Sequence, residues 1–260
     1  YGPARKYLRM RFPDARIARD FRHQDVPEGS IVTIGAPRQD LSAAVEDAAT
    51  VRGTRPRSSL TYDAIGMAAV GAADLIVAEN VPAGHSVYLS LADWLAKEYG
   101  YRTTVSSAGA WEVGAPHRRE RIMLVAARRH FEPRHIEVIR QVAPPGLLPT
   151  PTASSATGPG RSGRSGGDNL QTRIHEGPDP DPALIITWAC TIGEMHPPLK
   201  DIEGRLNAAF VEWLMGLPST HAVGLSRTAS IRLAGNAVVR LQARLMLQRG
   251  LTAINNERNL

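Results

Sequence analysis

The sequence predicts an α/β protein with a mostly parallel sheet. Short apolar segments with the composition of strands alternate with segments of helical periodicity, which is the pattern of a parallel sheet. The strands are expected at residues 30–35, 74–78, 101–106 and 121–127, and the helices between them at about 62–72 and at 86–98. Polar residues directly follow the first two strands. In such sheets the active groups gather in the loops after the carboxyl ends of the strands, so we expect a site there.

The helix expected at residues 86–98 shows the periodicity most clearly. Val87, Leu91 and Leu95 recur every four positions and therefore lie on one helix face. Further helices are expected at residues 1–12, interpreted as the end of a helix whose start is absent, at 206–217 and at 236–248.

Composition limits the class of protein. Hydrophobic residues make up 43% of the 260 residues and charged residues 22%, the balance of a globular protein. No apolar run approaches the roughly 18 residues that a membrane helix needs. A single cysteine, Cys190, excludes an intramolecular disulfide and a cysteine metal cluster, and fits a reducing, cytoplasmic setting. The net charge of +6 favours a polyanionic partner, although an arginine-rich composition without a binding role explains it equally well.

Several motifs occur in a fixed order along the chain. They are residues 37–42 (Pro-Arg-Gln-Asp-Leu-Ser), 57–60 (Arg-Ser-Ser-Leu), 79–81 (Glu-Asn-Val), 114–121 (Gly-Ala-Pro-His-Arg-Arg-Glu-Arg), 147–152 (Leu-Leu-Pro-Thr-Pro-Thr), 206–217 (LNAAFVEWLMGL) and 235–239 (Gly-Asn-Ala-Val-Val). Through these motifs the sequence resembles the DNA (cytosine-5) methyltransferases of phages and actinobacteria over nearly its whole length. The resemblance implies a Rossmann-like methyltransferase fold with a smaller, loop-rich target-recognition region. It also implies S-adenosylmethionine as cofactor, double-stranded DNA as partner, no metal, and a cytoplasmic protein encoded by a bacterium or a phage.

The resemblance implies covalent catalysis on a cytosine flipped out of the duplex. A thiolate that adds to C6 makes C5 nucleophilic toward the methyl donor. Glu79 is expected to hold the flipped base and to assist at N3, while Arg119 and Arg121 form an opposing clamp, with Arg121 at the base carbonyl oxygen. The alternatives are a solvated carboxylate at a strand end and surface salt bridges of the two arginines.

By the same resemblance, five residues are expected to bind the cofactor: Asp20, Pro37, Leu60, Asn236 and Val238. Asn236 would approach the methionine part of the cofactor, or alternatively cap a helix. Asp20 would lie near the adenine, or alternatively be an ordinary turn residue.

DNA contacts are expected from Gln39 and Ser42 and from a basic loop. Residues 144–182 are rich in Gly, Pro, Ser and Thr, which favours a flexible linker. The alternative is a mobile loop whose Arg161 and Arg164 contact DNA phosphates.

Arg38 departs from the family pattern, because it occupies the place of the catalytic cysteine. A guanidinium group stays protonated at working pH and is not a nucleophile. Cys190 is not a convincing substitute, since a lone cysteine with apolar neighbours is more often a small buried residue.

The Gly-rich strand and loop with which the family begins is not found before Arg38. We therefore expect an incomplete cofactor site, with the first strand supplied by an upstream segment or by a second polypeptide. The expected domains are 1–143, an α/β domain lacking its first strand, 144–204, the target-recognition region, and 205–260, C-terminal helices returning to the α/β domain.

Three functional hypotheses follow. The first is a cytosine-5 methyltransferase, linked to restriction–modification and impaired or inactive as this chain. The second is a DNA-binding pseudoenzyme or one subunit of a split methyltransferase. A methyltransferase of small molecules is a weaker third, because Glu79, the two arginines and the basic loop suit DNA.

Overall fold

The computed structural model describes residues 2–18, 20–35, 59–128, 135–137, 142–156, 169–218 and 221–256. The chain divides into two compact units. We call residues 18–108, 120–140 and 244–260 the sheet unit, and residues 1–17, 109–119 and 141–243 the helical unit. These ranges differ from the expected domains, because the chain crosses between the units several times.

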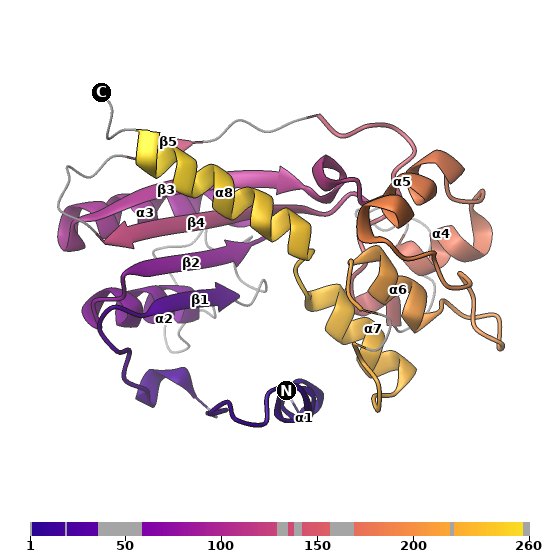
Figure 1. Cartoon of the computed structure of the whole chain (residues 1–260), viewed down its shortest axis with the longest axis horizontal. Helices are drawn as coiled ribbons and strands as arrows, with labels where there is room; N and C mark the ends of the chain where they lie inside the picture. The colour runs from indigo at the N-terminus through magenta and orange to yellow at the C-terminus, as the bar shows by residue number, and fades with distance from the viewer. Residues whose placement is uncertain are drawn as a thin grey trace, which may run out of the picture. The chain divides into compact units, whose positions relative to one another are not determined.

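A five-stranded sheet, in the order β1-β2-β4-β3-β5, forms the centre of the sheet unit among the described residues. Its strands are β1 (Ile31–Gly35), β2 (Leu75–Asn80), β3 (Tyr101–Gly109), β4 (Glu120–Arg128) and β5 (His135–Glu137). β1 pairs with β2 and β3 with β5 in parallel, whereas β4 is antiparallel to β2 (Figure 1). The predicted α/β class is confirmed, and the four predicted strands are all present.

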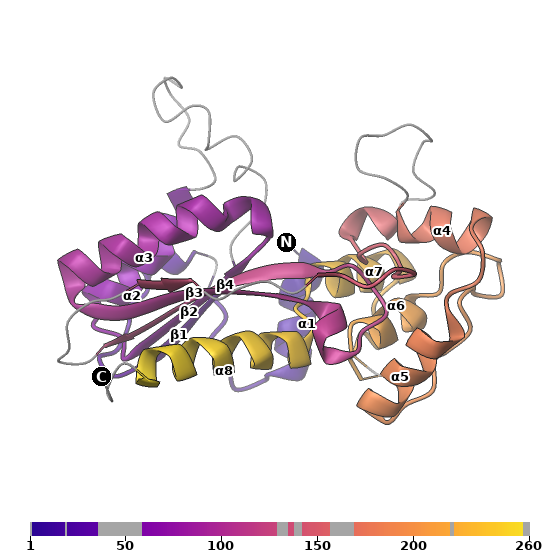
Figure 2. The ribbon, with the colours of Figure 1, turned by 90° about the horizontal axis from the view of Figure 1, so that it is seen from above.

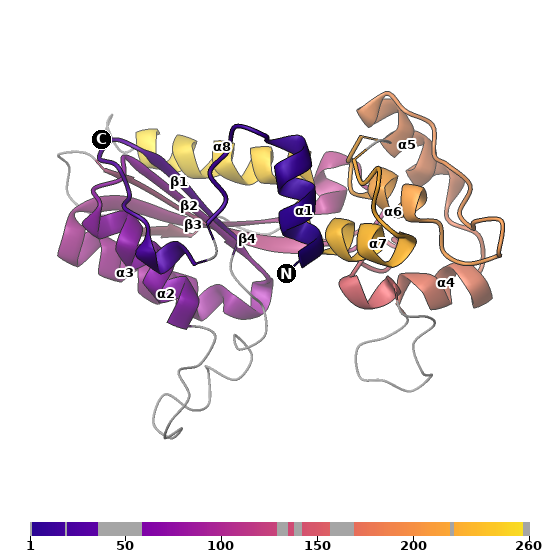
Figure 3. The same cartoon turned by 90° about the horizontal axis from the view of Figure 1, so that it is seen from below.

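Helices cover both faces of this sheet. α2 (Ser59–Val70) and α3 (His85–Tyr99) lie on one face, and α8 (Arg240–Asn256) runs along the other (Figures 2 and 3). The predicted face of α3 is confirmed, since Val87, Leu91 and Leu95 are buried in the core.

α8 lies close to the sheet because Gly250 has no side chain. A Cβ at this position would lie 2.7 Å from Val125 Cγ2. Hydrogen bonds fasten the two layers, since Ser106 Oγ donates to the Met246 carbonyl over 3.2 Å and Arg249 Nη1 donates to the Ser107 carbonyl over 3.1 Å.

The helical unit contains short helices around two buried tryptophans. Its elements are α1 (Gly2–Arg11), η3 (Ala110–Val113), η4 (Ala153–Ala156), α4 (Leu170–Glu176), α5 (Pro182–Ile192), α6 (Ala208–Leu214) and α7 (Arg227–Asn236). Trp188 Nε1 donates to the Trp213 carbonyl over 2.9 Å, and Trp213 Nε1 donates to the Glu194 carbonyl over 2.8 Å. Both indoles are therefore buried with their polar atoms satisfied.

Two expectations for this part of the chain are wrong. A single helix was expected at 236–248, but α7 ends at Asn236 and α8 begins at Arg240, with an extended residue, Ala237, between them. Residues 144–182 are also not a linker throughout, because η4 and α4 form there and bury Ala156 and Leu170. Apolar residues within a Gly- and Pro-rich composition supply the core contacts that a linker lacks.

The remaining elements fit or extend the predictions. The helix expected at 206–217 is present as the shorter α6, capped by Asn207, whose side chain accepts a hydrogen bond from Ala209 N. β5 and α7 were not expected. None of the helices in the described ranges is long and apolar enough to cross a membrane.

Candidate active site and cofactor cavity

Glu79 and Arg121 form a buried ion pair in the sheet unit. Glu79 is near the end of β2 and Arg121 near the start of the antiparallel β4, so the two meet at the same edge of the sheet. Arg121 Nε lies 2.6 Å from Glu79 Oε1, and the two side chains are 4% and 17% exposed. The structure therefore brings together two of the residues expected at the base, and it rules out a solvated carboxylate at Glu79.

Glu79 Oε1 faces Arg121 without a well-aligned hydrogen bond. Among the residues that the structure describes, none donates a well-aligned hydrogen bond to the buried Glu79 Oε1, although the charge of Arg121 stabilises it. Arg121 Nη1 donates to the neighbouring Glu120 carbonyl over 2.6 Å, which fixes the guanidinium plane. A carboxylate oxygen with a free lone pair in a buried setting favours a ligand that brings its own donor.

The rest of the Glu-Asn-Val motif holds the end of the strand. Asn80 is buried, and its Oδ1 accepts a hydrogen bond from Val81 N over 2.8 Å, a local turn that ends β2. The hydroxyl of Tyr88 on α3 donates to the Glu79 carbonyl over 3.1 Å. Burial raises the pKa of Tyr88, so this hydroxyl remains a donor throughout the physiological range.

Arg119 has a different setting, in the helical unit. Its side chain is 1% exposed, and Nη1 donates to the carbonyls of Pro151 and Gly235, each over 3.3 Å. Nη2 donates to the Ala237 carbonyl. The last carbonyls of a helix lack partners within the helix, and Arg119 supplies donors at the end of α7. It is not a surface salt-bridge residue, and this geometry explains its place in the motif by fastening the Gly-Asn-Ala-Val segment.

Asn236 is the last residue of α7 and is exposed, and Val238 is half-buried. Asn236 does not cap the following helix, which begins four residues later at Arg240, so that alternative is wrong. Gly235 explains how the segment is positioned. A Cβ there would lie 2.4 Å from the backbone carbon of Thr152, so α7 approaches η4 at a distance that only glycine permits.

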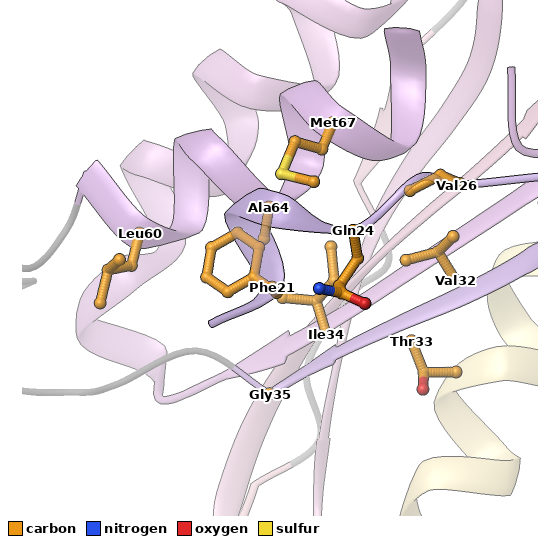
Figure 4. Close-up of a pocket in the computed structure, with 10 residues that line it drawn as sticks. All are labelled: Phe21, Gln24, Val26, Val32, Thr33, Ile34, Gly35, Leu60, Ala64 and Met67. Carbon is orange, nitrogen blue, oxygen red and sulfur yellow. The ribbon is translucent and has the colours of Figure 1, made fainter. Parts of the chain in front are cut away.

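An apolar cavity of about 440 Å³ lies beside β1 in the sheet unit (Figure 4). It is lined by residues of η1 (Phe21–His23), β1 and α2 and of the segment after η1, namely Phe21, Gln24, Val26, Val32, Thr33, Ile34, Gly35, Leu60, Ala64 and Met67. Leu60, expected at the cofactor, is one of them. We call this space the β1 cavity.

Asp20 directly precedes Phe21, which lines the β1 cavity, but Asp20 itself is not one of the lining residues. Its Oδ1 accepts a hydrogen bond from Arg22 N over 3.0 Å, which caps η1. Arg22 Nη2 also lies 2.6 Å from Oδ2. The side-chain and backbone hydrogen bonds of Arg22 lower the pKa of Asp20 to about 2. Both carboxylate oxygens are thus engaged locally, and the structure supports the turn-residue interpretation of Asp20.

Other expected site residues lie outside the described residues: Pro37, Arg38, Gln39, Ser42, Arg161 and Arg164. The expectation of a buried thiol at Cys190 is wrong, because this cysteine is exposed on α5 beside the buried Trp188 and Ala189. In the described part of the chain, no three or more His, Cys, Asp or Glu side chains come together as a metal site would need.

Sequence reasoning missed the contribution of Phe21, Gln24 and Met67 to the β1 cavity. The first two follow Asp20 within four residues, so the aromatic residue beside the expected acid was an available signal. Met67 offered none, because a methionine in a helix is more often part of a core.

Comparisons with known proteins identify the family and the fold of the chain. Residues 4–155 match the family described as C-5 cytosine-specific DNA methylase. Comparison with curated proteins gives no significant match. The fold is similar to that of Dnmt2 methyltransferase from S. pombe, with a TM-score of 0.57 and 13% identity over 98% of this chain and 90% of that one.

Two further solved structures share the fold. A DNMT2 mutant from Spodoptera frugiperda gives a TM-score of 0.55 and 17% identity over 95% of this chain and 89% of that one. The Entamoeba histolytica methyltransferase EhMeth gives a TM-score of 0.53 and 13% identity over 95% of this chain and 86% of that one.

Proposed function

Because the chain belongs to the C-5 cytosine-specific DNA methylase family, we propose that it binds S-adenosylmethionine and a flipped cytosine of double-stranded DNA, but transfers the methyl group poorly or not at all. The observation that carries this proposal is the buried pair of Glu79 and Arg121. The DNA substrate and the loss of activity are both part of the proposal.

The pair suits the polar edge of cytosine. This edge carries an amine donor at N4, the ring nitrogen N3 and the carbonyl oxygen O2. The carboxylate of Glu79, whose Oε1 is paired with Arg121 but has no well-aligned hydrogen bond, would accept a hydrogen bond from the amine or from a protonated N3. The guanidinium of Arg121 has several fixed donors, one of which suits O2. Thymine has an acceptor in place of the amine, so the carboxylate disfavours it.

The β1 cavity suits the adenosyl part of the cofactor. Phe21 and Leu60 offer apolar surfaces for the flat faces of an adenine ring, and the walls are otherwise mainly aliphatic. Bound S-adenosylmethionine supplies the methyl group for transfer. Within this chain, Phe21 and Leu60 would hold the adenine ring of the cofactor.

Arg38, at the place of the catalytic cysteine, is the reason to expect little or no methyl transfer. Residue type alone supports this step, because a guanidinium is cationic at working pH and has no lone pair to add to C6. Loss of an essential nucleophile lowers rates on the order of a million-fold in well-studied enzymes. The remaining residues then bind a base that the chain cannot activate.

A binding experiment tests recognition of the base. Duplexes with one unpaired cytosine or one unpaired thymine lower the cost of flipping, and their affinities are compared by fluorescence anisotropy at several salt concentrations. We expect wild type to prefer cytosine by about tenfold and Glu79→Gln to lose that preference. Glu98→Gln, at an exposed position on α3, is the matched control. Equal binding of both duplexes by wild type contradicts the role of Glu79.

A covalent trap tests the loss of activity. The protein is incubated with S-adenosylmethionine and duplex DNA containing 5-fluorocytosine, and denaturing gels reveal any adduct. We expect no adduct with wild type and a detectable adduct with Arg38→Cys. A denaturation-resistant complex of the wild type would show that a nucleophile other than the expected cysteine is at work, and the pseudoenzyme interpretation would be abandoned.

A further inference from the structure

The β1 cavity contains one polar side chain with an unusual position, Gln24. Its carboxamide lies between the ring of Phe21 and the side chain of Val32 (Figure 4). Thr33, the other polar residue of the lining, points to the opposite face of β1, as the alternation along a strand requires. Gln24 is therefore the hydrogen-bonding side chain that faces the apolar walls.

Local hydrogen bonds fix the orientation of this carboxamide. Gln24 N donates to the Phe21 carbonyl over 2.9 Å and ends η1. Its Nε2 donates to the His23 carbonyl over 2.9 Å. Rotating the amide by half a turn would place Oε1 against that carbonyl, where two acceptors repel each other. The oxygen is thus the end of the amide left for a ligand, and no side chain or backbone group in the described ranges donates to it.

We propose that Gln24 recognises the adenine of the cofactor by accepting a hydrogen bond from its exocyclic amine while Phe21 packs against the ring. This inference rests on the proposed function, in which the β1 cavity holds the adenosyl group. Asp20 then acts as a positioning residue, because its carboxylate caps η1 and pairs with Arg22, which holds Phe21 and Gln24 in place.

The geometry predicts specificity for adenine over hypoxanthine. Hypoxanthine has a carbonyl oxygen where adenine has the amine, and this oxygen would face Gln24 Oε1. Turning the amide to offer Nε2 would sacrifice the hydrogen bond to His23. Leaving a polar group in an apolar site without its partner costs about tenfold in affinity.

The test compares S-adenosylhomocysteine with its deaminated analogue S-inosylhomocysteine by isothermal titration calorimetry. We expect wild type to bind the adenine compound about tenfold more tightly. Gln24→Leu should bind it about fivefold more weakly than wild type and discriminate the two compounds by less than twofold. S-inosylhomocysteine should bind Gln24→Leu as tightly as it binds wild type, to within about twofold, which separates the loss of adenine recognition from damage to the fold. Gln248→Leu, at an exposed position on α8, is the matched control and should behave as wild type.

The outcomes distinguish the two proposals. If wild type binds S-adenosylhomocysteine but Gln24→Leu keeps a preference of about tenfold for it over S-inosylhomocysteine, the role of Gln24 is overturned. The proposal that the β1 cavity holds the adenosyl group then still stands. Equal binding of the two compounds by wild type also overturns the role of Gln24. If wild type binds neither compound, both the assignment of the cavity and the role of Gln24 fall.

Discussion

Arg121 Nε lies 2.6 Å from Glu79 Oε1 across the antiparallel strands β4 and β2, and neither side chain is more than 17% exposed. Burying two charges costs desolvation energy that their attraction offsets only when the geometry is good. Such a pair is therefore weak evidence for stability. Its position at the carboxyl end of β2 makes a site the better explanation.

Replacing Arg121 by methionine should destabilise the protein strongly. The change leaves Glu79 buried without its countercharge, which typically costs about 3–5 kcal/mol in the free energy of unfolding. Urea denaturation measures this loss. The double variant Glu79→Gln/Arg121→Met removes both charges and should recover part of it. If the double variant is as unstable as Arg121→Met alone, the uncompensated charge is not the cause.

The sequence predicted the sheet unit well, because its strands are short apolar runs with sharp polar ends. β2 alternates half-buried and buried residues from Leu75 to Asn80, and its last polar residues are the site. The Glu79 and Arg121 pair could be anticipated from the motifs, since both lie at the ends of predicted strands. Their mutual contact needed the register of β2 with β4, which periodicity does not give.

The helical unit was predicted less well because tertiary contacts decide its structure. The break between α7 and α8 depends on Arg119, which is more than a hundred residues away along the chain and donates to the carbonyls at the break. A local pattern of apolar residues continues through that break. Likewise, the Gly- and Pro-rich composition of residues 144–182 concealed Leu170, which is fully buried.

Arg119→Met should destabilise the protein by about 2–4 kcal/mol, because it leaves buried carbonyls at the end of α7 without donors. Thermal denaturation checks the change. Arg118→Met, at the exposed neighbouring position, should alter stability by less than about 0.5 kcal/mol. Equal effects of the two variants would argue against a structural role for Arg119.

Gly235→Ala should also destabilise the protein, by about 1–3 kcal/mol, because the added Cβ would overlap the backbone of Thr152 and Ala153. Backbone atoms cannot move aside as a flexible side chain can. Gly66→Ala on α2 is the control, since its Cβ would meet Trp94 at an ordinary contact distance of 3.6 Å and alanine favours a helix. Chemical denaturation of both variants should therefore show effects of opposite sign, and a neutral Gly235→Ala would contradict the close approach of α7 to η4.

Glu212 on α6 should make stability depend on pH between about 4.5 and 7. Burial raises the pKa of this carboxyl from 4.5 to about 7, against the opposing effect of a hydrogen bond from Ala222 N. The folded state then holds its proton more tightly than the unfolded state. Its contribution is fully present below pH 4.5 and is lost as pH rises to about 7, by an amount on the order of 3 kcal/mol.

The difference between wild type and Glu212→Gln isolates this contribution, because other groups titrate nearby. Burial lowers the pKa of His221, which acts in the opposite sense, and Arg22 lowers that of Asp20, which acts only in stronger acid. Both of these groups are shared by the two proteins and cancel in the comparison. In urea titrations from pH 4.5 to 7.5, we expect the free energy of unfolding of wild type to fall relative to that of Glu212→Gln. A constant difference across that range would mean that Glu212 ionises in the folded protein as readily as in the unfolded chain.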